Sequence, residues 1–434
     1  MNNDMSNYSI ENNTLIISLS IKNNIKNINV FLDTYIDHIK KDNPNFKDIT
    51  KICFYEGHLN DIFFMYHGEK YKQFEKIIFK NVCFRGRIEI EGAFSILSFN
   101  MCIFENNRYF YKDISNVFIN NSTTSIGLSK FELINCNNIW ISSDGKYISR
   151  IGNKPLVYDI TIKDSKFLNI IENSKEIKEQ HGGLDINLKN RVQIENISQE
   201  VNFKNATYFS VIVNGQIKNF NLNDSIFDEI NFHNATCHKF KCSNTTIDKL
   251  NLSKSEFVAM PQFDEKTSIK HSVDIDKKTF DNLLKIENTG SLEYSRLAEF
   301  FNRNNAYMEA QQLHRHYLLA KAKESKSCGL KTWVGLYDLI NGCGTSLQMP
   351  FILMLCLLYV NIGVLEFQFL KLKEGSEVLI YAINNILPMS GLFTHSKGVC
   401  LPGVILALKF TSILATLLWF LIALQIRKLL KLKD

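Results

Sequence analysis

A chain of 434 residues, 45% of them hydrophobic and 22% charged, is long enough for two or three domains. Its net charge of +6 is small, and no dense basic stripe with interleaved aromatic residues is present, so no nucleic-acid partner is expected. The first 330 residues are rich in Asn, Lys, Ile, Ser and Asp. We attribute that bias partly to an AT-rich genome and give it little structural meaning.

Residues 1–74 are expected to form a mixed α/β cap. Thr14 to Ile21 predicts a strand, Val30 to Ile39 a short helix, and Lys51 to Tyr55 a second strand. A cap is needed because the open end of a repeat stack exposes its interior and its unpaired strand edge.

Residues 75–260 repeat every five residues. The period is unbroken over 210–257 and continues with lapses through 75–170, where Glu89 interrupts it. It fails between Ile170 and Ser198, which predicts an irregular insertion near 170–200 around His181-Gly182-Gly183. The residues expected to point inward in the regular run are Ile212, Ile217, Leu222, Phe227, Phe232, Cys237, Cys242, Ile247, Leu252 and Phe257.

A period of five fits neither a helix, with 3.6 residues per turn, nor a strand, with a period of 2. It fits a chain that takes a short extended step, turns a corner and repeats, so that one apolar residue per step enters a shared interior. We therefore predict a β-solenoid for this domain.

The run resembles the pentapeptide-repeat family, whose motif has a small residue two places before Leu or Phe. Asn234-Ala-Thr-Cys-His followed by Lys239-Phe-Lys-Cys-Ser carries the resemblance, although Phe240 is bulkier than the usual small residue. The resemblance implies a right-handed, four-sided parallel β-helix with four pentapeptides per coil. Some members imitate DNA with a strongly acidic surface, which the balanced charge of this chain does not predict.

The ten cysteines show no metal-binding spacing with histidines, and Cys136, Cys237 and Cys242 occupy apolar repeat positions. They are expected to be buried free thiols in a reducing compartment. The first 30 residues show no secretory signal, so the repeat domain is predicted to be cytoplasmic.

Residues 261–346 are predicted to be a helical connector. Apolar residues three to four apart indicate two antiparallel helices, about Leu292 to Phe301 and Ala306 to Lys323. The segment from Tyr294 to Ala310 resembles the helix pair that follows the repeats in a membrane-bound branch of the same family. His314 and His316, two residues apart, do not share a helix face and are not expected to bind a metal.

Two apolar stretches, about 347–370 and 401–424, predict a transmembrane domain over 347–426, followed by a basic tail over 427–434. Buried helices of a soluble protein are the alternative. Nine Lys and Arg flank the outer ends of the pair and three lie between the spans, which places both termini in the cytoplasm. Together with the resemblance to the membrane-bound branch, the two spans and their flanking charges predict a multi-pass protein of a bacterial inner membrane.

Residues 377–393 between the spans have helical spacing up to a break at Pro388 and Gly391. An amphipathic helix on the outer membrane surface is expected, with a re-entrant helix as the alternative. Span, re-entrant helix, span is the layout of two-span cation channels, but their Thr-Val-Gly-Tyr-Gly filter is absent. Glu366 and Lys409 are the charges within the spans, and they could pair, line a hydrated path or, for Lys409, snorkel to the interface.

No catalytic triad, phosphate-binding Gly loop or metal-ligand cluster is recognisable, so no enzyme, catalytic residue, metal or cofactor is expected. One hypothesis is an inner-membrane protein that presents its β-helix as a scaffold for interaction or assembly. The other is a homo-oligomeric two-span ion channel or pore, with the β-helix as a gating or assembly domain. The expected partners are the lipid bilayer and either another protein or further copies of this chain.

Overall fold

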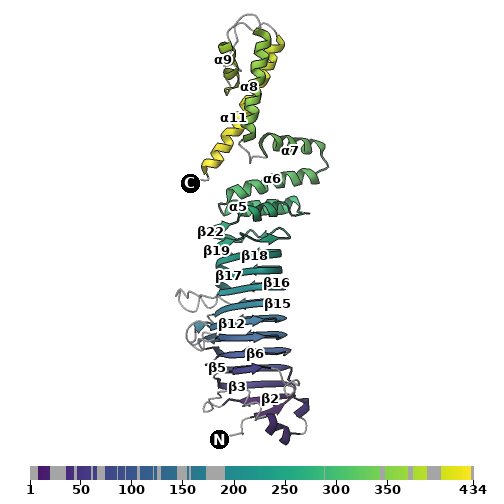
Figure 1. Cartoon of the computed structure of the whole chain (residues 1–434), viewed down its shortest axis with the longest axis vertical. Coiled ribbons are helices and arrows are strands. Elements are labelled where there is room, and N and C mark those ends of the chain that lie inside the picture. The colour runs from purple at the N-terminus through teal and green to yellow at the C-terminus, as the bar shows by residue number, and fades with distance from the viewer. Residues whose placement is uncertain are drawn as a thin grey trace. The chain divides into compact units, whose positions relative to one another are not determined.

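The computed structural model in Figure 1 describes residues 8–19, 36–43, 46–59, 62–65, 74–85, 87–92, 94–104, 108–120, 122–124, 129–143, 154–155, 158–172, 191–287, 289–342, 348–369, 375–388 and 402–431. The chain forms two compact units, Met1–Glu287 and Asn288–Asp434. The first is a β-solenoid and the second is helical.

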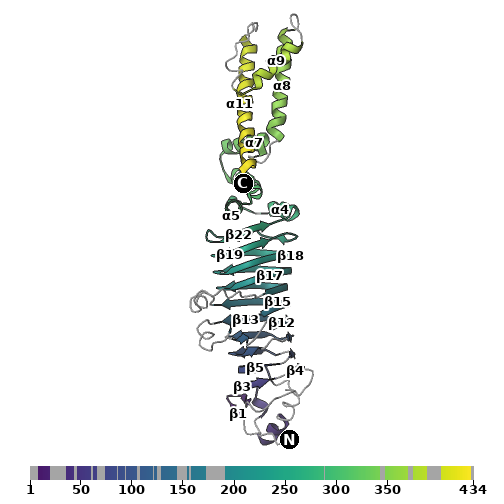
Figure 2. The same cartoon turned by 90° about the vertical axis from the view of Figure 1, so that its left-hand side faces the viewer.

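The first unit is a parallel β-solenoid of about 8 turns over residues 51–274, as the period of five predicts. Its stacked strands are visible from two sides (Figures 1 and 2). The strands of this unit are β1 (Tyr8–Glu11), β2 (Thr14–Ser18), β3 (Lys51–Leu59), β4 (Ile62–Met65), β5 (Lys76–Phe84), β6 (Ile88–Glu91), β7 (Ile96–Asn100), β8 (Ile103–Phe104), β9 (Arg108–Lys112), β10 (Asn116–Asn120), β11 (Thr123–Thr124), β12 (Ser129–Ile134), β13 (Asn138–Ser143), β14 (Lys154–Pro155), β15 (Tyr158–Glu172), β16 (Arg191–Lys204), β17 (Thr207–Asn223), β18 (Ile226–Ser243), β19 (Thr246–Asn251), β20 (Glu256–Phe257), β21 (Gln262–Phe263) and β22 (Ser268–Asp274).

Successive coils stack in parallel register. Between β17 and β18, Phe220 pairs with Phe240 and Leu222 with Cys242, each 20 residues later in the chain. Four steps of five residues therefore make one coil. Within each step the two buried positions lie two residues apart, as in the pairs Ile230 and Phe232, Ala235 and Cys237, and Leu250 and Leu252.

The solenoid extends beyond the predicted limits of 75 and 260 at both ends. β3 pairs in parallel with β2 and β5, and the rings of Phe54, Phe79 and Phe99 stack with centroids 5.0 and 5.2 Å apart. At the other end β22 pairs with β19, inside the residues assigned to the helical connector. The five-residue period fades in these coils because a ladder of backbone hydrogen bonds does not require a repeating side-chain type.

The N-terminal elements lie close to their predicted places. β2 covers the first five residues of the strand predicted over Thr14 to Ile21, and β3 contains the strand predicted over Lys51 to Tyr55. A short helix runs over 36–42, and residues 30–35 of the predicted helix lie outside the described residues. β1 pairs antiparallel with β2.

The predicted insertion near 170–200 is shorter than expected. β15 runs to Glu172, β16 begins at Arg191, and Arg191 pairs with Asp159 in the preceding coil. The strand therefore resumes before Ser198, although its side chains do not keep the period of five. The segment around His181-Gly182-Gly183 lies outside the described residues.

Two aspartates close the last coil. In earlier coils a corner N–H donates to a carbonyl of the next coil, as Asp224 N does to Ser243 O at 3.0 Å. Asp264 accepts the corner N–H of Asn244 at 2.9 Å, and Asp276 accepts that of Lys254. Asp276 is also the N-cap of α4 (Lys277–Leu284), whose buried Phe280 and Leu283 complete the unit. Carboxylates thus replace the carbonyls that a further coil would supply.

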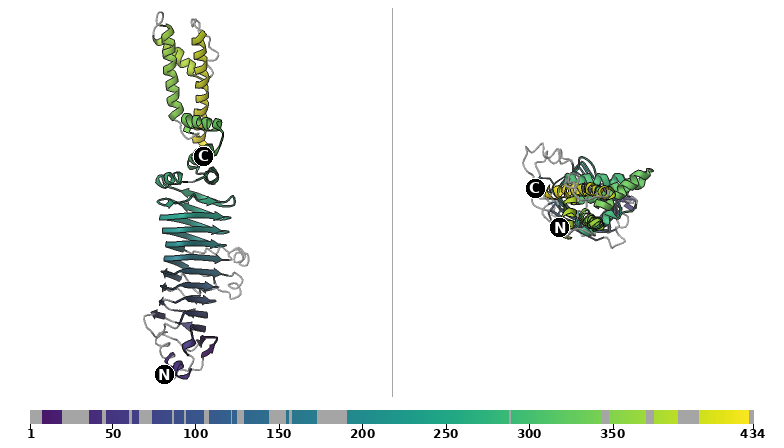
Figure 3. Two further views of the ribbon diagram at one scale, coloured as in Figure 1. Left: turned by 90° about the vertical axis from the view of Figure 1, so that its right-hand side faces the viewer. Right: turned by 90° about the horizontal axis from the view of Figure 1, so that it is seen from above.

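The second unit contains α5 (Ser291–Arg303), α6 (Tyr307–Glu324), α7 (Cys328–Asn341), α8 (Gln348–Phe369), α9 (Gly375–Ile386) and α11 (Pro402–Lys431). α5 and α6 match the predicted helix pair, whereas α7 was not predicted. α8 and α11 are long and apolar enough to cross a membrane, over Gln348–Glu366 and Gly403–Leu424. They run side by side, with α9 beside them (Figures 2 and 3).

Candidate functional site

Nine of the ten predicted core residues are buried in the solenoid, namely Ile217, Leu222, Phe227, Phe232, Cys237, Cys242, Ile247, Leu252 and Phe257. The prediction for Ile212 is wrong, because its side chain is 37% exposed. Val211 and Val213 on either side of it are fully buried instead.

The cause is a residue missing from the repeat at the corner after Val213. Val213 pairs with Phe232, only 19 residues later. Gly215 forms the corner with a φ of 70°, and a Cβ at this position would lie 2.0 Å from Asn196 Oδ1 in the preceding coil. Glycine fits because it has no Cβ and tolerates positive φ. The inward positions before the corner are therefore shifted by one residue relative to those after it.

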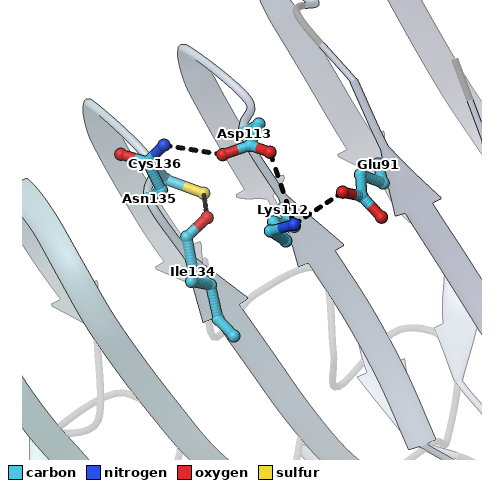
Figure 4. Close-up of polar contacts among 6 residues, drawn as sticks. All are labelled: Glu91, Lys112, Asp113, Ile134, Asn135 and Cys136. Atoms are coloured by element: carbon cyan, nitrogen blue, oxygen red, sulfur yellow. Dashed lines mark hydrogen bonds and ion pairs between the residues drawn. The ribbon is translucent and has the colours of Figure 1, made fainter. Parts of the chain in front are cut away.

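Asparagine and aspartate build other corners. Asp113 and Asn135 have φ values of 57° and 54°, and Asn135 Nδ2 donates to Asp113 Oδ1 at 2.6 Å across neighbouring coils (Figure 4). Asn244 and Asp224 repeat this arrangement, also at 2.6 Å. Asn and Asp tolerate the left-handed conformation better than other residues with side chains. The Asn content therefore has structural meaning, contrary to our expectation.

Charged side chains on the solenoid surface form ion pairs between coils. Lys112 Nζ lies 2.6 Å from Glu91 of the preceding coil and 3.7 Å from Asp113 (Figure 4). Lys163 and Glu195 are 3.2 Å apart in the same way. Such exposed pairs add about 0–1 kcal/mol each. They reduce the net charge that these positions offer to a partner.

All eight cysteines that the structure describes are free. Burial raises the pKa of Cys102, Cys136 and Cys237 to about 12. These thiols are protonated at neutral pH, so they are poor nucleophiles and poor metal ligands. Their role in the solenoid is packing.

The two histidines of α6 lie beside aromatic rings. The His316 ring is 5.5 Å from that of Tyr294, and His314 is 5.4 Å from Tyr317. Burial and the neighbouring Arg315 lower the pKa of His316 below its usual value, so it is neutral at neutral pH. In the described part of the chain no group of His, Cys, Asp and Glu has a metal-binding arrangement.

Glu366 and Lys409 are not brought together. Both side chains are exposed on the surface of the helical unit, and no ion pair or hydrogen bond joins these two described residues. The structure thus gives no support to the pairing that was one of the sequence-based alternatives.

A different set of polar residues meets between α8, α9 and α11. The Asn385 amide on α9 donates to Asn361 Oδ1 at 3.1 Å and to Thr411 Oγ1 at 3.0 Å. Thr411 Oγ1 in turn donates to Asn361 Oδ1 at 2.7 Å or to the Leu408 carbonyl at 2.9 Å. We call Asn361, Asn385 and Thr411 the polar cluster. All three are buried, and each comes from a different helix.

Two polar atoms near this level of the helices lack a hydrogen-bond partner. Both residues are 0% exposed, and neither Asn361 Nδ2 nor Ser412 Oγ makes a hydrogen bond. The sequence offered only a weak signal for these residues. Asn361 stood out as a polar interruption of an apolar stretch, but nothing linked it to Asn385 or Thr411, which lie 24 and 50 residues away.

α9 packs along both long helices. Val378 and Ala382 on α9 are buried together with Leu365 of α8. Near the other end of α9, Trp419 Nε1 of α11 donates to the Ile386 carbonyl at 2.9 Å. Amides and hydroxyls in such a cluster do not titrate near neutral pH. Its evident chemical role is to hold three helices in one register.

Comparison of the chain with protein-family models, with curated proteins and with solved structures found no match.

Proposed function

We propose that this chain is a membrane protein in which α8 and α11 cross the bilayer and the β-solenoid serves as an assembly platform. The observation that carries the proposal is the exposure of the two apolar helices. Only 22% of the α8 segment and 28% of the α11 segment are buried within the chain. Core helices of a soluble protein would be mostly buried, whereas lipid can cover the exposed apolar side chains.

The lengths of the two segments fit a bilayer. At 1.5 Å per residue, the 19 and 22 residues of the two segments span about 28 and 33 Å, against a hydrocarbon core of about 30 Å. The excess of Lys and Arg outside the pair supports a topology with both termini in the cytoplasm, most simply at a bacterial inner membrane. The free buried thiols of the solenoid fit a reducing compartment.

α9 favours the re-entrant arrangement over the surface-lying helix that we expected. Its Asn385 bonds to Asn361 and Thr411, which lie five residues from Glu366 and eight from Gly403, the neighbouring ends of the two apolar segments. Those distances along a helix amount to about 8 and 12 Å. A helix lying on the membrane surface would not reach that depth.

The platform function is supported by the form of the solenoid. Its core is apolar, its corners are held by hydrogen bonds between coils, and the surface charges named above pair with each other. We propose that the solenoid belongs with the pentapeptide-repeat family, on the resemblance of residues 210–257, and with its membrane-bound branch, on the resemblance of the helix pair from Tyr294 to Ala310. A rigid repeat surface of this kind suits an extended protein partner or further copies of the chain.

Extraction of the full-length protein tests the anchor. We expect it to stay in the membrane pellet at alkaline pH and high salt, and to dissolve only with detergent. Release by alkaline carbonate would contradict the proposal. Cross-linking in intact membranes, followed by size measurement in mild detergent, then separates self-association from binding of another protein.

A pore is the second candidate, and the place of α9 is what favours it, since span, half-length helix and span occur in this order. We would measure ion flux in proteoliposomes for the native chain, Glu366→Gln and Lys409→Leu, with oligomers shown to be intact. A pore lined by either residue should change its ion preference in the corresponding variant. We expect no flux above that of empty liposomes, as the platform requires.

A further inference from the structure

α7 has one face that packs inside the helical unit. Val334 is buried against Ala322, Leu318 and Leu319 of α6. One turn later Asp338 holds Arg315 of α6 through two contacts, Nε to Oδ1 at 2.6 Å and Nη2 to Oδ2 at 3.1 Å. These two positions define the face of α7 that is turned toward α6.

The opposite face of α7 carries three exposed apolar side chains. At about 100° of rotation per residue, Leu336 lies about 180° from the centre of the α6-facing side, and Trp333 and Leu339 flank it at about 120°. Their exposed fractions are 43%, 71% and 66%. We call Trp333, Leu336 and Leu339 the apolar stripe of α7.

The position of α7 in the chain indicates what covers the stripe. Gly342, with a φ of 52°, ends the helix, and the first apolar span begins at Gln348. Six residues lie between Asn341 and Gln348, and even fully extended they reach only about 20 Å. If α8 enters the bilayer at its N-terminal end, α7 cannot be far from the headgroups.

The composition of α7 also fits a bilayer surface. Trp is enriched at membrane interfaces, and interfacial helices combine an apolar face with flanking basic residues. Lys326 precedes the helix, next to its N-terminus, whereas Lys331 lies about 140° from Leu336, on the side turned toward α6. The Lys326 ammonium is therefore the one placed to meet anionic headgroups while the stripe enters the apolar region.

We infer that α7 is an interfacial helix that lies in the headgroup region of the same bilayer, with its apolar stripe toward the lipid and its Val334 side toward α6. The inference rests on the proposed membrane anchor. It makes α7 a second membrane contact of the chain, which holds α6 parallel to the surface on the side away from the lipid.

The three tryptophans of the chain provide the test. Trp140 is in the solenoid, Trp333 is in the stripe, and Trp419 is in the second span. Three full-length variants, each keeping one Trp and carrying Phe at the other two positions, are reconstituted in phosphatidylcholine/phosphatidylglycerol vesicles. The lipids carry bromine either near the headgroup end or near the end of the acyl chain, and brominated lipids quench a nearby Trp.

We expect Trp419 to be quenched, Trp140 to keep its fluorescence, and Trp333 to lose most of its fluorescence with the shallow bromines and little with the deep ones. Quenched Trp419 with unquenched Trp333 would overturn the α7 inference and leave the anchor standing. If Trp419 were unquenched as well, the anchor itself would be wrong. Strong quenching of Trp333 by deep bromines alone would contradict a surface position.

A matched pair of variants checks that the stripe is responsible. In the Trp333-only chain, Leu336→Asp with Leu339→Asp should relieve the quenching of Trp333. Leu292→Asp places one such carboxylate at a 56% exposed apolar position on α5, outside the stripe, and should leave the quenching unchanged. An equal effect of both changes would contradict a specific role of α7. In the Trp419-only chain neither change should alter the quenching.

Discussion

At the scale of single residues, the solenoid depends on which side chains point inward and on which residues tolerate its corners. Ile212 and Ile247 have the same side chain and both keep the spacing of five, yet one is 37% exposed and the other fully buried. Their difference comes from the corner at Gly215, where the repeat is one residue short.

Ile247→Ala and Ile212→Ala form a matched test of this register. We expect Ile247→Ala to lower the free energy of unfolding by about 2–5 kcal/mol, because it leaves a cavity in the core, and Ile212→Ala to lower it by less than about 1 kcal/mol. Denaturant unfolding of the detergent-solubilised protein, followed by the circular dichroism of the strands, measures both. Equal losses would contradict the shifted register.

Gly215→Ala should destabilise the solenoid by about 1–3 kcal/mol, since the residue would be held at positive φ and its Cβ would meet Asn196 Oδ1. Asn196→Gly removes that oxygen and keeps a residue suited to the φ of 55° at position 196. The double variant should therefore lose less than the sum of the two single losses. Strict additivity would mean that the contact is not the cause.

At the scale of elements, both units depend on polar groups that join one element to the next. Asp276 links the turn between β19 and β20 to α4 by accepting the N–H groups of Lys254 and Thr279. In the helical unit, Asn385 ties α9 to α8 and α11. Each of these contacts joins segments that the five-residue or helical periodicity does not connect.

The end of the solenoid should be sensitive to acid. Hydrogen bonds from the backbone of Lys254 and Thr279 lower the pKa of Asp276 to about 2, from an ordinary value of 3.8. A depressed pKa in the folded state means that the stabilisation is present above about pH 4 and is lost as the pH falls toward 2. Amide exchange of α4 at pH 6 and pH 3 measures this. Asp276→Asn should weaken the protection at pH 6 and remove its pH dependence.

Asn385→Leu tests the polar cluster. The change keeps the size of the side chain but removes its amide, leaving Asn361 with fewer partners. Because hydrogen bonds between apolar helices contribute about 0.6–2 kcal/mol, we expect α9 to become more mobile while the two long helices remain. Spin labels or amide exchange on α9 would report it. Ile383→Leu, at a 40% exposed position of the same helix, is the control and should have little effect.

At the scale of the whole molecule, the proposed function depends on the orientation of the chain in the membrane. Single cysteines at His395, Lys326 and Lys433, in a chain whose own reactive cysteines are replaced, test it with a membrane-impermeant thiol reagent. His395 should be labelled from outside intact cells, and the other two only after permeabilisation. If the cysteine at position 395 were protected while the cysteines near the termini were labelled from outside, the orientation would be the opposite of the one proposed. His395 and Lys433 lie outside the described residues, so this prediction rests on charge alone.

Features that repeat, or that depend on neighbouring residues, could be predicted from the sequence. Five-residue spacing at nine of the ten core positions was enough to predict a solenoid, because each step buries its residue in the same way. The spans and the pair α5 and α6 were predicted because helix formation and hydrophobic length are read from neighbouring residues. The Asn and Asp residues of the corners were visible in the sequence too, but their role in building the corners was not.

Features that depend on contacts between distant residues became visible only in the folded chain. The place of Ile212 followed from a corner that meets Asn196 in another coil, and the limits of the solenoid followed from backbone ladders that carry no side-chain pattern. The polar cluster joins Asn361 to Thr411 across 50 residues. Such contacts leave no periodic trace in the sequence, because each forms only once and its energy appears only when the chain has folded.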